Sequence, residues 1–356
     1  MPHIYAHRNA VPKTMRALAK IDPKPGLKLI EALVPTPGPG EVLIRVRRTA
    51  LSAAAVQTDR WDNWARQTIR PPVIVGHEFV GLVASIGPGV SDFHQGELVL
   101  GEPYIACGTC RHCLAGRRHL CASARRLGQD RDGAFAEYVC LPQNAVWHAD
   151  PRLPLDVLAC FGPLGQAVRI ARRFDLLGAH VLVTGANALG GMTAAIARHA
   201  GARSVVVVDA NPGGLELARS LGGTHAVDTR TEEIGTIQRE LGIIDGFDLG
   251  IETSGRSAAL SDQITHLRHG GQLALLGSPS IESLVDGRAV VTKQLSLHGI
   301  DTRDNIPHWE RLTLALRGGL DITGVITHCL PVGCFREAFD RAAAGEPGKI
   351  ILDWEG

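Results

Sequence analysis

The sequence contains no apolar run of the roughly 18 to 20 residues that a membrane-spanning helix requires. Its first twenty residues, MPHIYAHRNAVPKTMRALAK, lack the apolar core of a secretory signal peptide. Neither sign of charge is in excess, because the formal net charge is +1 over 356 residues. Nothing therefore favours nucleic acid or a membrane surface as a partner. These absences predict a cytoplasmic protein with a small-molecule substrate.

Aromatic residues are also scarce, at 4%, whereas 41 residues are glycine. This balance is typical of a chain with many tight turns and strand-to-helix loops. The length suffices for two domains with separate cores. Disulfides are rare in the cytoplasm, so the eight cysteines need another explanation, at least where they cluster.

The pattern of the chain changes near residue 160. Before that point, apolar and β-branched runs at 42–48 and 73–86 predict a mainly β region. After it, predicted strands alternate with predicted helices, which indicates a parallel sheet with crossover helices. The strands are 181–184, 204–209, 247–252 and 272–276, and the helices include 192–199 and 215–221. From about residue 298 the chain leaves that sheet, and it ends in an amphipathic helix and a strand at 349–353.

Four cysteines, Cys107, Cys110, Cys113 and Cys121, follow the pattern C-x2-C-x2-C-x7-C. Zinc prefers four soft ligands in a tetrahedron, and closely spaced thiolates on a loop supply them. Four thiolates leave no open coordination position, so the pattern predicts one structural zinc per chain. An iron–sulfur cluster and four unrelated cysteines remain alternatives. The scattered cysteines are expected to be small core residues: Cys140, Cys160, Cys329 and Cys334.

A glycine-bearing turn follows the strand at 181–184 and opens a helix. It reads Gly185-Ala-Asn187-Ala-Leu189-Gly190, where a dinucleotide-binding turn would read G-x-G-x-x-G. Asn187 occupies the position at which glycine lets the backbone approach the pyrophosphate, and asparagine tolerates unusual backbone angles. Asp209 ends the next strand, where an acid accepts the ribose hydroxyls and favours NAD(H) over NADP(H). The alternative is a sheet of this type that no longer binds its cofactor.

From about Met15 to Trp354 the chain resembles the zinc-containing medium-chain dehydrogenases. The resemblance is carried by WDNWARQTIRPPVIVGHEFVG, CGTCRHCLAGRRHLC, DGAFAEYV, FDLLGAHVLVTGA, GGLDITGVITH and GKIILDW. It implies an α/β protein with a GroES-like, mainly-β catalytic domain at 1–160 and 299–356, containing a structural zinc loop at about 101–122. It also implies a Rossmann NAD-binding domain at 161–298, an active site in the cleft between them, and a homo-oligomer of two or four chains.

The family uses a catalytic zinc to polarise an alcohol oxygen while hydride passes to the nicotinamide, and a relay carries the proton to solvent. Relatives carry the zinc thiolate and the relay in a segment that reads roughly C-G-T-D-x-H. Aligned with it, this chain reads SAAAVQ at 52–57. The resemblance thus implies that Ser52 replaces the zinc thiolate, that Ala54 replaces the relay threonine, and that Gln57 replaces the relay histidine.

Three more positions depart from the family. Gly162 stands where relatives carry an acid, and Tyr104 stands where they carry a histidine. Arg169 also replaces a histidine, and it either binds a phosphate or carboxylate or lies exposed to solvent. His77 and Glu78 alone remain of the expected catalytic chemistry. Their alternative reading is structural, with the glutamate paired to a buried arginine and the histidine lining the cleft.

Three functions follow as hypotheses. The first is an NAD(H)-dependent oxidoreductase without a catalytic zinc, which transfers hydride to an activated C=C, C=N or C=O of a small polar substrate. Tyr104, Ser52 and His77 are then candidate proton donors, and Gln57 is a candidate hydrogen-bond donor to a developing oxyanion. The second is a zinc-dependent alcohol or amino-alcohol dehydrogenase with unusual ligands. The third is a lyase, isomerase or binding protein without redox function.

Overall fold

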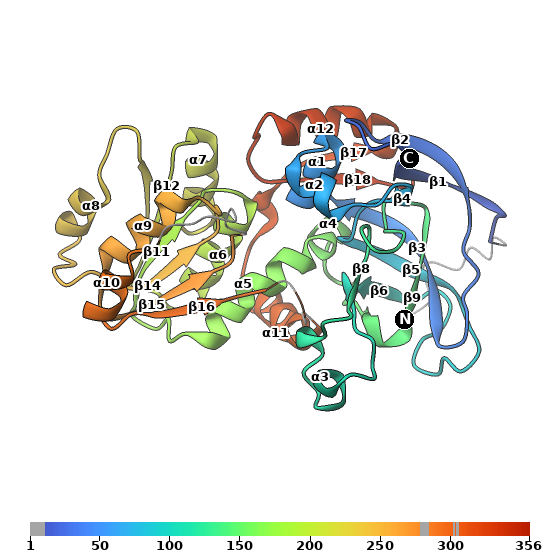
Figure 1. Ribbon diagram of the computed structural model, residues 1–356, viewed down its shortest axis with the longest axis horizontal. Helices are drawn as coiled ribbons and strands as arrows, with labels where there is room; N and C mark the ends of the chain where they lie inside the picture. The colour runs from blue at the N-terminus through green and yellow to red at the C-terminus, as the bar shows by residue number, and fades with distance from the viewer. Residues whose placement is uncertain (1–10, 278–284, 302, 304–305) are drawn as a thin grey trace.

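A computed structural model describes residues 11–277, 285–301, 303 and 306–356 (Figure 1). Residues 1–10, on which part of the expectation about a signal peptide rests, lie outside this set. Figure 1 shows a β-rich part on one side, a sheet with surrounding helices on the other, and helices α5 and α11 between them.

The β-rich part contains two main sheets and confirms the mainly β character expected before residue 160. A three-stranded sheet has the order β2 (Lys28–Leu33), β1 (Thr14–Lys20), β4 (Val73–Ile74). A seven-stranded sheet contains β10 (Val146–His148), β6 (Leu98–Gly101), β5 (Phe79–Ile86), β3 (Glu41–Ala50), β18 (Lys349–Asp353) and β17 (Ile326–Pro331), with β9 (Tyr138–Pro142) also paired to β3. The final strand, predicted at 349–353, therefore returns to pair with the strand at 41–50.

Short helices and a small hairpin complete this part. The helices are α1 (Ala53–Arg60), α2 (Asn63–Thr68), α3 (Arg111–Leu114), α4 (Leu155–Ala159) and α12 (Phe335–Ala343). Strands β7 (Tyr104–Ile105) and β8 (Arg125–Arg126) form an antiparallel pair beside the lobe that carries α3, which projects from the body in Figure 1.

The run at 73–86 is not one strand, because it breaks between β4 and β5 at Gly76. Gly76 has a φ of +91°, a conformation that favours glycine, and a Cβ there would lie 1.9 Å from the Phe135 ring. The break takes His77 and Glu78 out of the strands and places them in the short connection before β5.

The second part is a six-stranded, all-parallel sheet, as the alternation of strands and helices predicted. Its order is β13 (His225–Asp228), β12 (Ser204–Asp209), β11 (His180–Thr184), β14 (Phe247–Glu252), β15 (Leu267–Leu275), β16 (Ser296–Gly299). Its helices are α6 (Ala188–His199), α7 (Pro212–Leu221), α8 (Ile234–Glu240), α9 (Ser257–His266) and α10 (Gly287–Thr292). Strand order reverses between β11 and β14, and in such sheets ligands bind outside the carboxyl ends of the strands at that point.

An apolar core joins the two parts. Helices α5 (Phe161–Arg173) and α11 (Ile306–Arg317) pack against each other, with Phe161, Leu164, Trp309 and Leu312 all buried. The indole nitrogen of Trp309 donates a hydrogen bond of 2.9 Å to the carbonyl of Phe161. This core holds the crevice between the sheet and the β-rich part in a fixed geometry.

No helix among the described residues combines the length and the apolar character that crossing a bilayer demands.

A very close glycine contact supports the turn between β11 and α6. A Cβ on Gly190 would fall 1.9 Å from the carbonyl oxygen of Gly185, so no side chain fits there without moving the backbone. We expect Gly190→Ala to destabilise the protein by about 1–3 kcal/mol or more, the usual cost of overpacking. Urea denaturation measures the change. Gly287→Ala is the matched control, because a Cβ at this helical glycine meets nothing within 4 Å. Equal stabilities of the two variants would contradict this account of the turn.

Candidate active site and cofactor site

The four clustered cysteines form a compact set of sulfur atoms. Their ligand atoms all lie within 4.8 Å of one another, and the Cys110–Cys113 and Cys107–Cys121 sulfur pairs are both 3.5 Å apart. Zinc–sulfur bonds of about 2.3 Å in a tetrahedron separate the sulfurs by roughly 3.8 Å, so the set fits zinc. Backbone hydrogen bonds from Thr109 and Cys110 lower the pKa of Cys107 to about 6, which favours the thiolate that zinc binds.

The scattered cysteines divide into two kinds. Cys140 and Cys160 are buried, as expected of small core residues. The expectation is wrong for Cys329 and Cys334, which are exposed. Cys329 lies on the outward side of β17, where buried and exposed positions alternate, and Cys334 lies in the turn that leads into α12.

Asn187 supports the glycine-bearing turn in a way that the sequence did not indicate. Its backbone is ordinary, with a φ of −80°, so its tolerance of unusual angles is not used. Its side-chain oxygen instead caps α6 by accepting a hydrogen bond of 3.0 Å from the amide of Gly190, and its side-chain nitrogen donates to the carbonyl of Thr253 at 3.0 Å. Among the described residues, the amides of Ala188 and Leu189 have no hydrogen-bond partner.

Two backbone donors therefore point from the first turn of α6, which is the arrangement that binds phosphate groups. Gly185 has a φ of +100°, and Gly190 allows the close approach of helix and strand. Both glycines thus have the geometry expected of a dinucleotide-binding turn.

Asp209 lies at the end of β12, beside that turn. One carboxylate oxygen accepts a hydrogen bond of 2.8 Å from the amide of Ala186, and the other accepts bonds of 2.7 and 2.9 Å from the amides of Ala210 and Asn211. The segment 210–214, Ala-Asn-Pro-Gly-Gly, contains no lysine or arginine. The segment that directly follows the Asp209 anion therefore contributes no cation.

Glu78 is buried and paired with a lysine. One of its carboxylate oxygens lies 2.6 Å from the Lys349 ammonium, which also donates a hydrogen bond of 2.7 Å to the carbonyl of Leu51. Burial raises the pKa of the Glu78 carboxyl, against the opposing effect of Lys349. The partner expected from the sequence was an arginine, and the structure corrects this to Lys349, the lysine of the GKIILDW motif.

Ser52 and Gln57 lie on or next to helix α1. The hydroxyl of Ser52 caps this helix by accepting a hydrogen bond of 3.2 Å from the amide of Ala55. Ala54 has no functional group, and the side-chain amide of Gln57 has no hydrogen-bond partner among the described residues. Gln57 is partly buried, so its amide is a donor that remains available to a ligand.

Gly162 lies in the first turn of α5, against Glu78. A Cβ on Gly162 would sit 3.5 Å from the Cγ of Glu78, an ordinary contact distance. An acid at this position, as relatives carry, would thus adjoin the Glu78–Lys349 pair. Its absence here leaves Glu78 as the one carboxylate at this contact.

Tyr104 lies in β7, opposite Arg126 of β8. Leu127, just after β8, donates to the carbonyl of Pro103 at 2.9 Å, and a Cβ on Gly128 would lie 2.7 Å from the amide of Gly76. The hairpin therefore packs against the residue that precedes His77, so Tyr104 belongs to the same region.

Arg169 is half-buried, and one nitrogen of its guanidinium is bonded to the backbone. It donates hydrogen bonds of 2.9 and 2.7 Å to the carbonyls of Asp301 and Arg303. The guanidinium of Arg303 in turn lies 5.7 Å from the centre of the Tyr104 ring. Sequence reasoning missed Arg303 and Lys349. Lys349 was visible in a family motif, whereas nothing in the sequence around Arg303 indicated a function.

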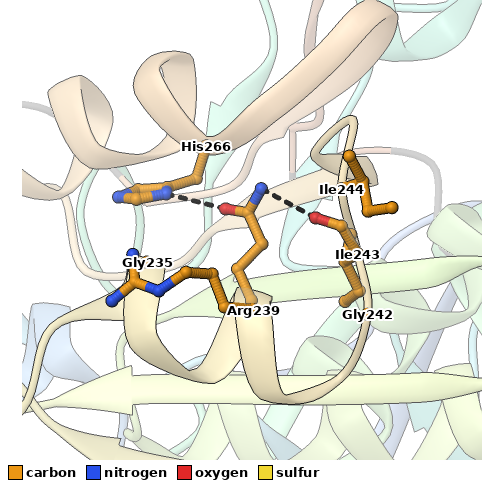
Figure 2. A pocket seen from close by; sticks show the side chains of 7 residues that line it. Gly235, Arg239, Gly242, Ile243, Ile244 and His266 are labelled. Atoms are coloured by element: carbon orange, nitrogen blue, oxygen red, sulfur yellow. Dashed lines mark hydrogen bonds between the residues drawn. The ribbon is translucent and has the colours of Figure 1, made fainter.

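Among the described residues, the candidate catalytic side chains form neither a cluster of metal ligands nor the lining of the hollow described next. Only the four clustered cysteines form a group of three or more His, Cys, Asp or Glu with ligand atoms within 4.8 Å. Figure 2 shows a surface hollow of about 350 Å³ between α8 and α9, where Gln238 bonds to His266 and to the carbonyl of Ile243. None of the candidate catalytic residues lines this hollow.

Comparison with known proteins defines the class. Residues 38–151 match the family model described as the alcohol dehydrogenase GroES-like domain, and residues 188–316 match the one described as zinc-binding dehydrogenase. The chain therefore belongs to the zinc-binding dehydrogenases of the medium-chain dehydrogenase/reductase family, which are NAD(P)-dependent oxidoreductases. Within that family it is similar to L-threonine 3-dehydrogenases.

The relative from Streptomyces coelicolor is 48% identical over 340 residues, covering 96% of this chain and 99% of the relative. The one from Solibacter usitatus is 45% identical over 341 residues, covering 96% and 100%. Among solved structures, an alcohol dehydrogenase from Thermus sp. ATN1 has a TM-score of 0.85 at 25% identity, covering 95% of this chain and 99% of that chain. The expected fold of a GroES-like part and a Rossmann-like sheet is thereby confirmed.

The first prediction from this site concerns the buried ion pair. Lys349→Met leaves the Glu78 carboxylate buried without its partner, so we expect a loss of about 3–5 kcal/mol in the free energy of unfolding. The double variant Lys349→Met/Glu78→Gln should recover most of that loss, as measured by urea denaturation. Lys28→Met is the control, because the exposed Lys28–Asp22 pair at 3.1 Å contributes about 0–1 kcal/mol. Additive losses in the double variant would contradict a direct pairing.

The second prediction concerns pH. Burial, with a smaller effect of the Lys349 charge, lowers the pKa of His77 to about 4, below the ordinary 6.5 of an unfolded histidine. The unfolded chain thus binds this proton more readily, so His77 contributes stability above pH 6.5 that is lost as the pH falls toward 4. We expect this contribution of His77 to the free energy of unfolding to be about 1–2 kcal/mol, because partial exposure of the ring to solvent weakens the shift in its pKa.

The measurement is urea denaturation at pH 7.5 and pH 5. His77→Gln should lose less stability on acidification than the wild-type protein. His269→Gln, an exposed substitution in β15, should keep the wild-type pH dependence. An unchanged pH dependence in His77→Gln would rule out a buried neutral histidine.

Proposed function

We propose that this protein is an NAD(H)-dependent oxidoreductase that works without a catalytic zinc. In this proposal, hydride passes to the carbon of an activated C=C, C=N or C=O in a small polar substrate, and a proton completes the reduction. The observation that carries the proposal is the placement of Ser52. Its hydroxyl caps helix α1 at the position where relatives carry the zinc thiolate.

The other residues of the site support the same conclusion. Catalytic zinc sites have three protein ligands and one open position. Here the Glu78 carboxylate is paired with Lys349, Gly162 has no side chain, and His77 contributes a single neutral nitrogen. The resemblance thus implies that the zinc thiolate, and an acid of the relay or the outer metal shell, are replaced by groups that bind zinc weakly or not at all.

The nicotinamide cofactor, when bound, supplies or accepts the hydride. The amides of Ala188 and Leu189 would bind its pyrophosphate, and Asp209 would accept hydrogen bonds from the ribose. The anion at Asp209, with no cation at 210–214, favours NAD(H) over NADP(H). The free amide of Gln57 would donate to the oxygen on which negative charge develops.

A second function is favoured by the close similarity to L-threonine 3-dehydrogenases. Zinc-dependent oxidation of an amino alcohol requires that Ser52 or a water replaces the missing thiolate. Activity on L-threonine that a chelator abolishes would support it. If the protein binds neither NADH nor NADPH at millimolar concentration, a non-redox function replaces both.

The zinc content of the protein separates the first two functions. We expect about one zinc per chain, held by Cys107, Cys110, Cys113 and Cys121, in protein purified without added metal and measured by elemental analysis. A value near two would mean that the cleft binds a metal around His77 and Glu78, and the zinc-dependent function would then take precedence.

A gain-of-ligand variant makes the same measurement more specific. Ser52→Cys/Gly162→Asp restores a thiolate and an acid, and the 3.5 Å distance from the Gly162 Cβ position to Glu78 leaves room for the new side chain. We expect its zinc content to rise toward two per chain. Each single substitution is a control. The zinc content of each single variant should remain near one per chain.

A further inference from the structure

Tyr104 and Arg303 bring the two parts of the chain into contact across the crevice. Arg303 follows Asp301 just beyond the carboxyl end of β16, whereas Tyr104 comes from the β7–β8 hairpin of the β-rich part. Ligands of open α/β sheets bind outside the carboxyl ends of the strands. The contact lies beyond the carboxyl end of β16, the edge strand of the sheet, on the side of the sheet where ligands of this fold bind.

One guanidinium group lies over the Tyr104 ring, and a second arginine is the cross-strand partner of Tyr104. Arg126 is the cross-strand partner of Tyr104, and side chains directly opposite in an antiparallel pair lie on the same face. The guanidinium of Arg303 lies over the ring, 5.7 Å from its centre.

Each arginine retains part of its hydrogen-bonding capacity. Arg126 uses Nε and Nη2 on Asp130, at 2.9 and 3.1 Å, and Arg303 uses Nε and Nη2 on Asp301, at 2.9 and 2.5 Å. Among the described residues, neither Nη1 group nor the Tyr104 hydroxyl has a hydrogen-bond partner. Three donors thus remain unused at one place, and such a set matches the two oxygens of a carboxylate.

Arg169 fixes this arrangement from helix α5. Its Nη1 donates to the backbone carbonyls of both Asp301 and Arg303, which holds the segment that carries the Arg303 guanidinium. The family resemblance places histidines at both 104 and 169. The residues that replace these two histidines, Tyr104 and Arg169, therefore both contact Arg303.

Three carboxylates of this region among the described residues are already paired with a cation. Gly162 replaces the family's acid, and Glu78 is already paired with Lys349 at 2.6 Å. Asp130 and Asp301 are each bound by their own arginine. Glu78, Asp130 and Asp301 are consequently poor counter-charges for the amino group of an amino-alcohol substrate.

We propose that Tyr104, Arg126 and Arg303 bind a carboxylate group of the substrate. The substrate class is then a small carboxylic acid with a reducible carbonyl, imine or alkene and no required amino group. The statement about a reducible group rests on the proposed oxidoreductase function, whereas carboxylate binding does not. Tyr104 in this scheme binds the substrate and does not deliver the proton, and Arg169 is a positioning residue.

Three ketones that differ in charge test the proposal: acetoacetate is an anion, acetone is neutral, and aminoacetone is a cation. Binding is measured by isothermal titration calorimetry, with and without saturating NADH. We expect acetoacetate to bind about tenfold or more tightly than acetone, because hydrogen bonds to a charged group typically contribute that much. Aminoacetone should bind no more tightly than acetone.

Variants identify the residues responsible. Arg303→Met, Arg126→Met and Tyr104→Phe should each reduce the affinity for acetoacetate, by about tenfold for the arginines, and leave the affinity for acetone unchanged. Arg125→Met is the matched control, because Arg125 is the exposed neighbour of Arg126 on β8 and donates to the carbonyl of Asp130. Arg169→Met should weaken acetoacetate binding without changing NADH affinity, and Arg169→Lys should restore part of it.

The outcomes separate this inference from the proposed function. Equal affinities for the three ketones, no acetoacetate binding at about 10 mM, or an equal loss in Arg125→Met would each overturn the carboxylate site. Acetoacetate binding in a protein that fails to bind NADH would retain the carboxylate site and reject the oxidoreductase function. NADH binding without a preference for acetoacetate would leave the oxidoreductase function standing and reject the carboxylate site.

Discussion

The buried ion pair between Glu78 and Lys349 is the interaction on which the rest of the site depends. Both groups are removed from water, and each compensates the desolvation cost of the other. Lys349 opens the last strand, β18, and its ammonium also bonds to the carbonyl of Leu51, just before helix α1. One ammonium group thus joins the end of the chain, the start of α1 and the segment that contains His77 and Glu78.

This pair also constrains the chemistry of the cleft. A carboxylate at 2.6 Å from an ammonium is already neutralised, so it attracts a metal ion less than a free carboxylate would. Relatives place a second acid beside it at position 162, whereas this chain has glycine there and serine at position 52. The same fold can therefore retain its ion pair, its packing and its cofactor turn while the ligands of a catalytic metal change.

Much of the fold followed from the sequence because it depends on local pattern. The valine-rich run of β12 and the glycines at 185 and 190 predict a strand and a turn from neighbouring residues alone, and the cysteine spacing predicts a compact set of sulfurs. The partner of Glu78, the capping role of Asn187 and the Arg169–Arg303–Tyr104 contacts were not predictable. Each of these depends on which side chain arrives from a distant segment, or on which backbone amide a polar side chain selects. Sequence spacing contains neither kind of information.

The substitutions that the family resemblance implies at positions 52, 162 and 169 all make the charge of the site less negative. On the family resemblance, serine and glycine stand in place of a thiolate and an acid, which removes negative charge, and Arg169 stands in place of a histidine and bonds to the backbone of Asp301 and Arg303. A site changed in this way loses its attraction for a dication and for an ammonium group, and it gains donors for an anion. Without a metal to polarise the reacting bond, the electrophile must be activated by conjugation or by hydrogen bonds such as the one available from Gln57. In the function and the carboxylate site that we propose, the loss of the zinc thiolate and the gain of guanidinium groups are consequently two parts of one change in the substrate that the site binds.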